Sequence, residues 1–259
     1  NEILAGDEHR TLYEAVKAVP EKFGITPGVD YPIIISFTSA DQDLSIQVHP
    51  TDDYAKTHEN TLYGKSESWY FIEPPSEGWI YADSLIEDKK EIKRSILNGD
   101  YESVVGKRLV SKNDLVYIPS GTLHALTRGA LVYEIQQSTD ITYRFFDYNR
   151  LDNDGKLRDL HLEDALDTLN TANRVKSSEF PKDTLISEQP YTMVRKTLEN
   201  VYHNTTDVAV AITVSKGSMC VDGHSILTGM SILVLPNETI SISQAAEEVV
   251  IATPKLYFK

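Results

Sequence analysis

Cysteine and long apolar runs are both scarce in this sequence. Cys220 is the only cysteine among 259 residues, which excludes a disulfide framework and a zinc site built from several cysteines. No run of about 18 or more apolar residues occurs, and the chain does not open on a basic segment followed by an apolar one. We therefore expect a cytoplasmic protein with no membrane-spanning helix and no secretory signal.

Positive charge is also in short supply. The chain has 25 Lys and Arg residues against 39 Asp and Glu residues, and its formal net charge is −14. Nucleic acids and anionic membranes are excluded as partners, because both bind basic surfaces. A small anionic substrate remains compatible with this composition if a few Lys and Arg side chains gather inside a binding site.

Most of the sequence consists of short apolar or alternating segments that are separated by turn residues. Such segments are typical of β-strands, and an apolar content of 41% is sufficient for one large domain or two smaller ones. Helical spacing replaces the strand pattern in three segments, 11–19, 84–98 and 161–170. The whole pattern predicts a mainly β fold, a sandwich or barrel, with helical insertions.

Two of the helical segments open on a capping-box pattern. Thr11 and Glu14 have the required spacing at the start of the first, and Ser84 and Glu87 have it at the start of the second. We expect the second helix to end at Gly99.

The polar stretch 171–190 contains two prolines and is predicted to be a linker. Behind it, "SKG…DG…LTGMSILVLP" echoes "VGKRLVSKNDLVYIPSGTLH" in the first half of the chain, and both resemble the glycine-punctuated hairpins of a cupin barrel. We therefore predict one domain over 1–170 and a second, cupin-like β-domain over 191–259.

The stretch "LSIQVHP" places a glutamine and a histidine on one face of a predicted strand. Side chains two residues apart in a strand point the same way, so Gln47 and His49 look away from Ile46 and Val48. A pair of polar side chains aimed together into a β-structure is a candidate for metal binding.

Two further residues can complete such a site. Glu67 in "GKSESWYF" and His124 in "IPSGTLHAL" lie beside predicted strands. With Gln47 and His49 they offer two imidazole nitrogens and two oxygens, which suit a divalent ion such as Zn²⁺ with one position left open. On the chemistry alone an alternative stays open, in which both histidines are ordinary, hydrogen-bonded and partly buried.

Five motifs follow one another along the chain: "DLSIQVHPTDDYA", "YGKSESWYFI", "VYIPSGTLHAL", "VYEIQQSTDITYRFFDYNR" and "GKLRDLHLEDAL". Together they resemble type I phosphomannose isomerase in its short bacterial form. This family consists of zinc-dependent cupin enzymes, with a double-stranded β-helix (jelly-roll) barrel, that interconvert mannose 6-phosphate and fructose 6-phosphate. The resemblance implies one Zn²⁺ per chain and a catalytic role for the domain over 1–170. The implied zinc ligands are Gln47, His49, Glu67 and His124.

The resemblance also implies catalytic roles for four further residues. Aldose–ketose isomerisation moves a proton between neighbouring carbons, so it needs a base and a cationic group beside the developing oxyanion. Arg144 matches the family's active-site arginine, and Glu134 matches a carboxylate that carries the proton. Lys65 can contact substrate hydroxyls or phosphate, and Asp140 matches an acidic position that orients Arg144 or Lys65. The structural alternatives are ion pairs for Arg144 and Glu134 and exposed turn positions for Lys65 and Asp140.

One position departs from the family pattern inside the matched region. The family usually carries a lysine in a stretch like "PLLIKFIDA", whereas this chain has "PIIISFTSA" with Ser36 at that place. The family also usually has a further N-terminal segment before the stretch matched by "NEILAG".

Two functions therefore stay open. The first is a mannose-6-phosphate isomerase that acts on a small sugar phosphate as a monomer or homodimer. The second is a metal-containing cupin that binds a sugar or sugar phosphate without efficient isomerisation.

The other histidines have no such support. His9, His58, His203 and His224 lie in polar, turn-like stretches, and we expect them to be exposed. His161 is expected to cap the helix that follows it or to pack against that helix.

Overall fold

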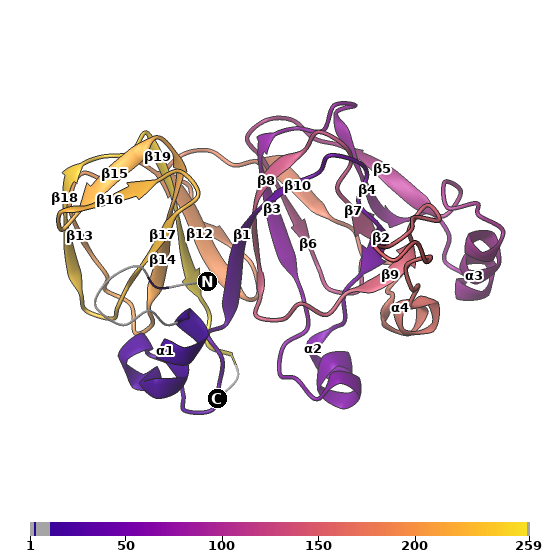
Figure 1. The fold of residues 1–259 in the computed structure, drawn as a ribbon, viewed down its shortest axis with the longest axis horizontal. Coiled ribbons are helices and arrows are strands. Elements are labelled where there is room, and N and C mark those ends of the chain that lie inside the picture. The colour runs from indigo at the N-terminus through magenta and orange to yellow at the C-terminus, as the bar shows by residue number, and fades with distance from the viewer. Residues whose placement is uncertain (1–2, 4–10, 258–259) are drawn as a thin grey trace. The chain divides into compact units, whose positions relative to one another are not determined.

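The computed structural model describes Ile3 and residues 11–257, and it is mainly β with a few short helices (Figure 1). The predicted class, mainly β with helical insertions, is confirmed. The chain divides into two compact units. The first unit spans Ile34–Phe180, and the second joins the segment up to Ile33 with the segment from Pro181 onward. No helix among the described residues is long and apolar enough to cross a bilayer.

The first unit is built on two five-stranded sheets, called here the β3 sheet and the β7 sheet. Strand β3 (Glu67–Glu73) pairs antiparallel with β8 (Leu131–Gln137), and β2 (Ile46–Val48) pairs antiparallel with β7 (His124–Ala125). The β3 sheet has the order β1 (Ile33–Ser39), β8 (Leu131–Gln137), β3 (Glu67–Glu73), β6 (Asp114–Ile118) and β10 (Lys176–Glu179). The β7 sheet has the order β5 (Val105–Leu109), β4 (Trp79–Ser84), β7 (His124–Ala125), β2 (Ile46–Val48) and β9 (Tyr143–Phe146).

An apolar core joins the two sheets. Trp69 and Phe71 of β3 belong to the same buried cluster as Ile80 and Ala82 of β4. Because residues two apart in a strand share a face, Glu67 continues the row that Trp69 and Phe71 begin. Its carboxylate is therefore carried into the space between the sheets.

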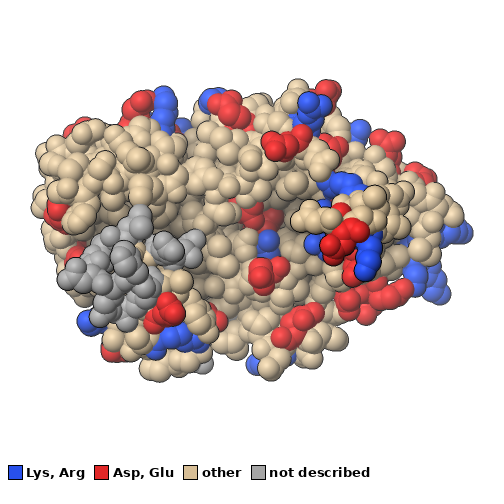
Figure 2. All heavy atoms as spheres, viewed as in Figure 1, with Lys and Arg blue, Asp and Glu red and all other residues tan. Residues whose placement is uncertain are grey.

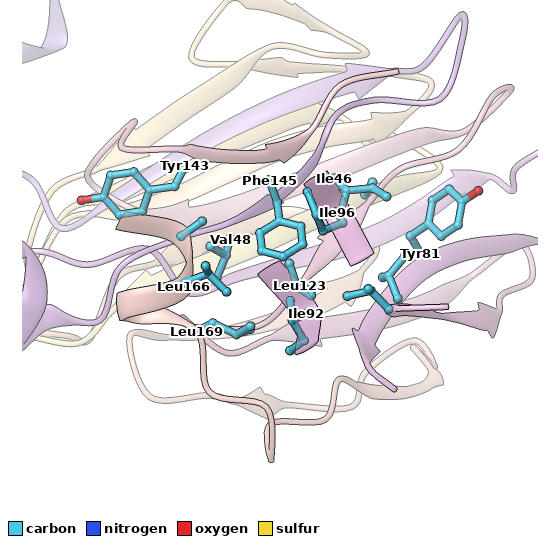
Figure 3. Packing of buried hydrophobic residues seen from close by; sticks show 14 residues of the cluster. Ile46, Val48, Tyr81, Ile92, Ile96, Leu123, Tyr143, Phe145, Leu166 and Leu169 are labelled. Atoms are coloured by element: carbon cyan, nitrogen blue, oxygen red, sulfur yellow. The ribbon is translucent and has the colours of Figure 1, made fainter. Parts of the chain in front are cut away.

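Two helices cover the other face of the β7 sheet. α3 (Lys89–Leu97) and α4 (Leu162–Thr168) supply apolar side chains to a second cluster, which also takes Ile46 and Val48 from β2 (Figure 3). Leu123 joins the same cluster just before β7. Side chains alternate between the two faces of a strand. The polar residues of β2 and β7 that lie next to these apolar ones therefore point to the opposite face, toward the β3 sheet.

The predicted helix over 11–19 is present. α1 spans Leu12–Ala18, and its capping box is confirmed, with the Thr11 side chain accepting from the Glu14 N–H and the Glu14 carboxylate accepting from the Thr11 N–H. The predicted helix over 161–170 is also present, as α4.

The helix predicted over 84–98 begins later than expected. The capping box at Ser84 is wrong, because Ser84 ends β4 and its hydroxyl donates to the carbonyl of Ile86. Asp88 is the N-cap instead, and α3 starts at Lys89. A short helical segment that the sequence did not predict follows β2, made of α2 (Asp52–Tyr54) and a π-helical turn (Ala55–Glu59).

The chain passes from the first unit to the second between Phe180 and Pro181, inside the stretch predicted as a linker. This stretch is not free of regular structure, since it contains β10, which pairs with β6, and β11 (Ile186–Ser187). The predicted boundaries also assigned the N-terminal segment to the first domain, whereas its described residues 11–33 belong to the second unit. The Tyr31 hydroxyl donates to the carbonyl of Ala209 at 2.8 Å, and the Ala209 N–H donates to the carbonyl of Phe23 at 2.9 Å.

The second unit also contains two sheets around an apolar core of its own. A 3₁₀ turn (Pro20–Phe23) follows α1. One sheet has the order β11, β12 (Tyr191–Lys196), β19 (Glu248–Pro254), β14 (Val210–Lys216) and β17 (Ser231–Val234). The other has the order β13 (Asn200–His203), β18 (Thr239–Gln244), β15 (Ser218–Val221) and β16 (His224–Leu227).

A fully buried asparagine ties loops of the second unit together. The Asn204 amide nitrogen donates to the carbonyls of Val208 at 3.0 Å, Val234 at 2.9 Å and Leu235 at 3.1 Å. Its amide oxygen accepts from the N–H of Thr206 at 2.9 Å and from the hydroxyl of the same residue at 2.8 Å. Both ends of the side chain are therefore satisfied without water.

Replacing this asparagine tests its contribution to stability. We expect Asn204→Ala to lower the free energy of unfolding by roughly 3 kcal/mol, because buried carbonyls lose their donor and a cavity remains. Urea denaturation measures the change. The matched control is Thr205→Ala at the exposed neighbouring position, which we expect to change stability by less than about 0.5 kcal/mol. Equal effects of the two substitutions would contradict the structural role of Asn204.

Candidate metal centre

Three buried side chains meet between the two sheets of the first unit. His49 follows β2, Glu67 begins β3 and His124 begins β7, and all three are at most 1% exposed. The His49 Nε2 atom lies 3.5 Å from Glu67 Oε2, and the His124 Nε2 atom lies 3.3 Å from Glu67 Oε1. The three possible ligand atoms all lie within 4.8 Å of one another. The structure thus brings together three of the four predicted ligands from distant parts of the sequence.

Backbone carbonyls determine which ring nitrogen of each histidine carries the proton. His49 Nδ1 lies 2.9 Å from the carbonyl oxygen of Ile141, and His124 Nδ1 lies 2.8 Å from the carbonyl oxygen of Thr122. A carbonyl oxygen can only accept, so each Nδ1 is the donor, and in the neutral ring each Nε2 is left with a lone pair. Both lone pairs are directed toward the Glu67 carboxylate, which is also an acceptor.

The pKa directions agree with an unprotonated acceptor cluster. Burial and the nearby Lys65 ammonium lower the pKa of His49 to about 3, so this ring is neutral at neutral pH. Burial by itself raises the pKa of Glu67, but the positive charge of Lys65 is the largest opposing cause, and the pKa of this carboxyl lies well below its ordinary value. Glu67 is therefore an anion beside a neutral imidazole.

A divalent cation resolves this arrangement. His49 Nε2 and both Glu67 oxygens are buried without a hydrogen-bond partner among the described residues. Ligands about 2.1 Å from a tetrahedral ion are separated from one another by about 3.4 Å, close to the two N–O distances at this site. The second nitrogen of a metal-binding histidine usually donates to a carbonyl or carboxylate, as both rings do here. The residues therefore fit a metal ion.

Gln47, the fourth predicted ligand, lies next to this cluster. It faces His124 in the β2–β7 ladder, and its amide nitrogen is 3.4 Å from His124 Nε2. Rotation of the carboxamide by half a turn exchanges this nitrogen for the amide oxygen, which is a metal ligand. Gln47 stays a predicted ligand on these grounds.

Lys65 and Glu134 adjoin the cluster on the side of the β3 sheet. The Lys65 ammonium lies 3.3 Å from Glu67 Oε2 and 3.8 Å from Glu134 Oε1, and both side chains are largely buried. Burial and the negative charge of Glu67 raise the pKa of Glu134 to about 7. A carboxyl with this pKa can both take up and release a proton near neutral pH, which is the property expected of an acid–base residue.

Arg144 lies one strand away from the histidines, and Asp140 lies apart from them. Arg144 faces Gln47 in the β2–β9 ladder, is partly buried, and its guanidinium donates to the carbonyl of Asp159 at 3.5 Å. Asp140 is exposed, and its carboxylate has no ion pair or hydrogen bond to another described residue. The structure places Arg144 beside the candidate site and does not bring Asp140 to it.

Sequence reasoning missed Thr38 as a neighbour of the candidate site. The Thr38 hydroxyl donates to Glu134 Oε2 at 2.9 Å and lies 3.4 Å from the Ser36 hydroxyl. The signal was available, since Thr38 is two residues after Ser36 in β1 and shares its face.

The remaining histidines among the described residues fall outside the cluster. His58, His203 and His224 are exposed, as predicted, and His9 lies outside the described residues. His161 occupies the N-cap position of α4 without a side-chain cap, and its Nδ1 accepts the N–H of Arg144 at 3.2 Å.

Charged side chains of both signs occur on the surface. Acidic and basic side chains are interspersed over the face shown in Figure 2 and do not separate into one extended basic region.

The sequence of this chain is similar to those of several known proteins. It is 42% identical over 166 residues to the Bacillus subtilis protein named "Probable mannose-6-phosphate isomerase GmuF", a match that covers 64% of this chain and 52% of that protein. It is 41% identical over 159 residues to the mannose-6-phosphate isomerase ManA of the same organism, covering 61% and 50%. The chain is thus similar to proteins named mannose-6-phosphate isomerase over about three fifths of its own length.

Solved structures extend this relationship to the fold. The crystal structure of the mannose 6-phosphate isomerase from Bacillus subtilis matches with a TM-score of 0.79 at 27% identity, over 96% of this chain and 84% of that one. The phosphomannose isomerase from Salmonella typhimurium matches with a TM-score of 0.69 at 10% identity, over 97% and 87%, and shows the fold alone. The predicted resemblance to these isomerases is confirmed.

The sequence match covers only part of this chain and only part of each curated relative. The chain spans about half the length of the curated mannose-6-phosphate isomerases that it matches. No protein-family model matches the chain.

Metal content tests the centre directly. We expect the purified protein to bind one divalent ion per chain, and His124→Ala to abolish stoichiometric binding, because the substitution removes one of two imidazole ligands. Elemental analysis after dialysis measures both. His203→Ala, at an exposed histidine of the second unit, is the control and should retain the ion. A wild-type protein without stoichiometric metal would contradict the assignment.

Proposed function

We propose that this protein is a zinc-dependent isomerase that interconverts mannose 6-phosphate and fructose 6-phosphate. The observation that carries the proposal is the buried cluster of Glu67 between two imidazole nitrogens, in a chain similar to mannose-6-phosphate isomerases. Lys65 and Glu134 add a cation and a proton-carrying group next to that cluster. Gln47, His49, Glu67 and His124 would hold the ion.

The reaction moves one proton between two neighbouring carbons of the open-chain sugar. The Glu134 carboxylate takes the proton from C2 of the aldose, which leaves an enediolate with its negative charge on O1. A proton then passes from the hydroxyl on C2 to O1, and the protonated Glu134 returns its proton to C1 to form the ketose. A carboxyl whose pKa lies near 7 can do both steps. Burial of Glu134 also keeps water from exchanging freely with the carried proton.

Cationic groups stabilise the oxygen atoms on these two carbons. A bound divalent ion supplies a Lewis acid that polarises a sugar oxygen. The Lys65 ammonium lies between Glu67 and Glu134, where it can donate to a substrate hydroxyl as charge develops there. The Arg144 guanidinium is always charged and suits either the phosphate group or a developing oxyanion.

A second candidate function is a metal-containing cupin that binds a sugar phosphate without efficient turnover. Ser36 favours it, because this position has a neutral hydroxyl where the resembled family carries a lysine. The Ser36 hydroxyl lies beside Thr38, which donates to Glu134, so a cation at this position would stand close to the proposed base. The two candidates differ in turnover and share the metal centre.

Substitution of the proposed proton carrier and of the arginine tests the reaction. We expect wild-type protein to convert mannose 6-phosphate in a coupled assay, to lose activity with a chelator and to regain it with Zn²⁺. Glu134→Gln should lower kcat by about 10²–10⁴-fold, because the amide cannot carry a proton. Arg144→Ala should lower it by about 10²–10³-fold, because one preorganised donor is lost.

Controls separate these effects from general damage. Glu179→Gln on β10 and Arg94→Ala on α3 change exposed side chains of the same types and should leave kcat unchanged. Metal content should be equal in all variants. Near wild-type turnover in both Glu134→Gln and Arg144→Ala would sink the assigned chemistry, and a wild-type protein that binds metal but shows no turnover would favour the second candidate.

The Ser36 position can be tested by restoring the cation. We expect Ser36→Lys to lower KM for mannose 6-phosphate by about 10-fold or more, because one charge-assisted hydrogen bond to phosphate contributes roughly 1.5–3 kcal/mol. KM for unphosphorylated mannose should not change. Ser39→Lys, on the opposite face of β1, is the control. Equal KM values for wild type and Ser36→Lys would show that this position does not contact the phosphate.

A further inference from the structure

A hydrogen-bond network holds the segment that carries Lys65 and Glu67. Asp52 Oδ1 accepts from the N–H of Gly64 and from the amide nitrogen of Gln137, both at 2.8 Å. The amide oxygen of Gln137 accepts from the N–H of Ser66 at 2.7 Å. The N–H of Lys65, between these two contacts, donates to the carbonyl of Pro50 at 2.9 Å. Three consecutive N–H groups are thus each held by a different residue.

The orientation of Gln137 in this network has no alternative. A carboxylate oxygen can only accept, so the amide nitrogen of Gln137 must face Asp52, and its amide oxygen must then face the Ser66 N–H. The backbone N–H of Gln137 also donates to the carbonyl of Ser66 at 3.1 Å. Gln137 is 1% exposed and Ser66 is 2% exposed, so water does not compete for these bonds.

The backbone at Gly64 packs directly against the backbone of residues 50–52. A Cβ atom on Gly64 would stand 2.4 Å from the carbonyl oxygen of Pro50 and 2.6 Å from the backbone nitrogen of Asp52. These are backbone atoms, which cannot move aside as a flexible side chain can. Glycine at this position allows the peptide of Gly64 to reach the Asp52 carboxylate.

The same network reaches the loops that carry the two histidines. The Ser66 hydroxyl accepts from the N–H of Ser120 at 3.0 Å. The next N–H, of Gly121, donates to the carbonyl of His49 at 2.7 Å. The carbonyl of Thr122 orients His124 through its Nδ1. All three candidate ligands are therefore attached, within one or two residues, to the network around Ser66.

We propose that Asp52 and Gln137 are positioning residues of the metal centre, which hold Glu67 and Lys65 at the distance from His49 and His124 that metal binding requires. The inference rests on the proposed function, because it takes the centre to bind a divalent ion. Asp52 acts through the N–H of Gly64 and the side chain of Gln137. Gln137 acts through the backbone of Ser66, one residue before Glu67.

Zinc affinity measures this role without reference to turnover. We expect Asp52→Ala and Gln137→Met to weaken Zn²⁺ binding by about 10- to 100-fold, the usual effect of losing a residue that orients a metal ligand. Methionine keeps the volume of glutamine but removes both hydrogen-bonding ends. Competition with a chromophoric zinc chelator at 25 °C gives Kd, and circular dichroism confirms that each variant is folded at that temperature.

Two further variants distinguish positioning from a general loss of stability. Asp52→Asn keeps the accepting oxygen and should restore Kd to within about threefold of wild type. Asp53→Ala removes a neighbouring exposed carboxylate and should leave Kd unchanged. A role confined to stability would lower the melting temperature of Asp52→Ala but leave its zinc Kd equal to that of wild type in the folded protein.

The outcomes separate this inference from the proposed reaction. Wild-type Kd values in both Asp52→Ala and Gln137→Met would overturn the positioning role, whatever the activity of the enzyme. Weakened binding in these variants, with Asp52→Asn rescued, would support it even if the wild type failed to isomerise mannose 6-phosphate. A wild-type protein that binds no Zn²⁺ would overturn the metal centre and the positioning role together.

Discussion

The placement of the Glu67 carboxylate between two imidazole nitrogens is the interaction on which the first unit depends. Three acceptors in a buried space repel one another unless a cation lies among them. The Lys65 ammonium, 3.3 Å from Glu67 Oε2, offsets part of this repulsion, while the carbonyls of Ile141 and Thr122 hold the Nδ1 side of each ring and leave both Nε2 atoms facing the carboxylate. The donor set therefore suits a divalent ion, whose charge would make the arrangement favourable.

The two-sheet architecture explains how such a polar cluster can exist inside an apolar core. Alternation along β3 adds Glu67 to the row of Trp69 and Phe71, and alternation along β2 separates Gln47 from the apolar pair Ile46 and Val48. The helices α3 and α4 bury that apolar pair on the outer face of the β7 sheet (Figure 3). The polar side chains therefore meet between the sheets, while the apolar side chains that stabilise both sheets stay packed.

Charge balance links this centre to the chemistry proposed for it. Glu67 and Glu134 share one cation, Lys65, so one carboxyl must bear a raised pKa, and Glu134 is the one whose pKa rises. The Thr38 hydroxyl holds the carboxylate of Glu134 in place and adds β1 to the elements that form the site.

Local pattern alone determined the strand class, the shared face of Gln47 and His49, and the capping box of α1, because each depends on residues a few positions apart. The same reasoning failed at Ser84, where the hydroxyl donates to Ile86 and Asp88 caps the helix instead. Only the tertiary structure decided that Asp52 and Gln137, 85 residues apart, form one hydrogen bond beside the metal centre. Such a contact depends on how the sheets pack, so the periodicity of the sequence cannot predict it.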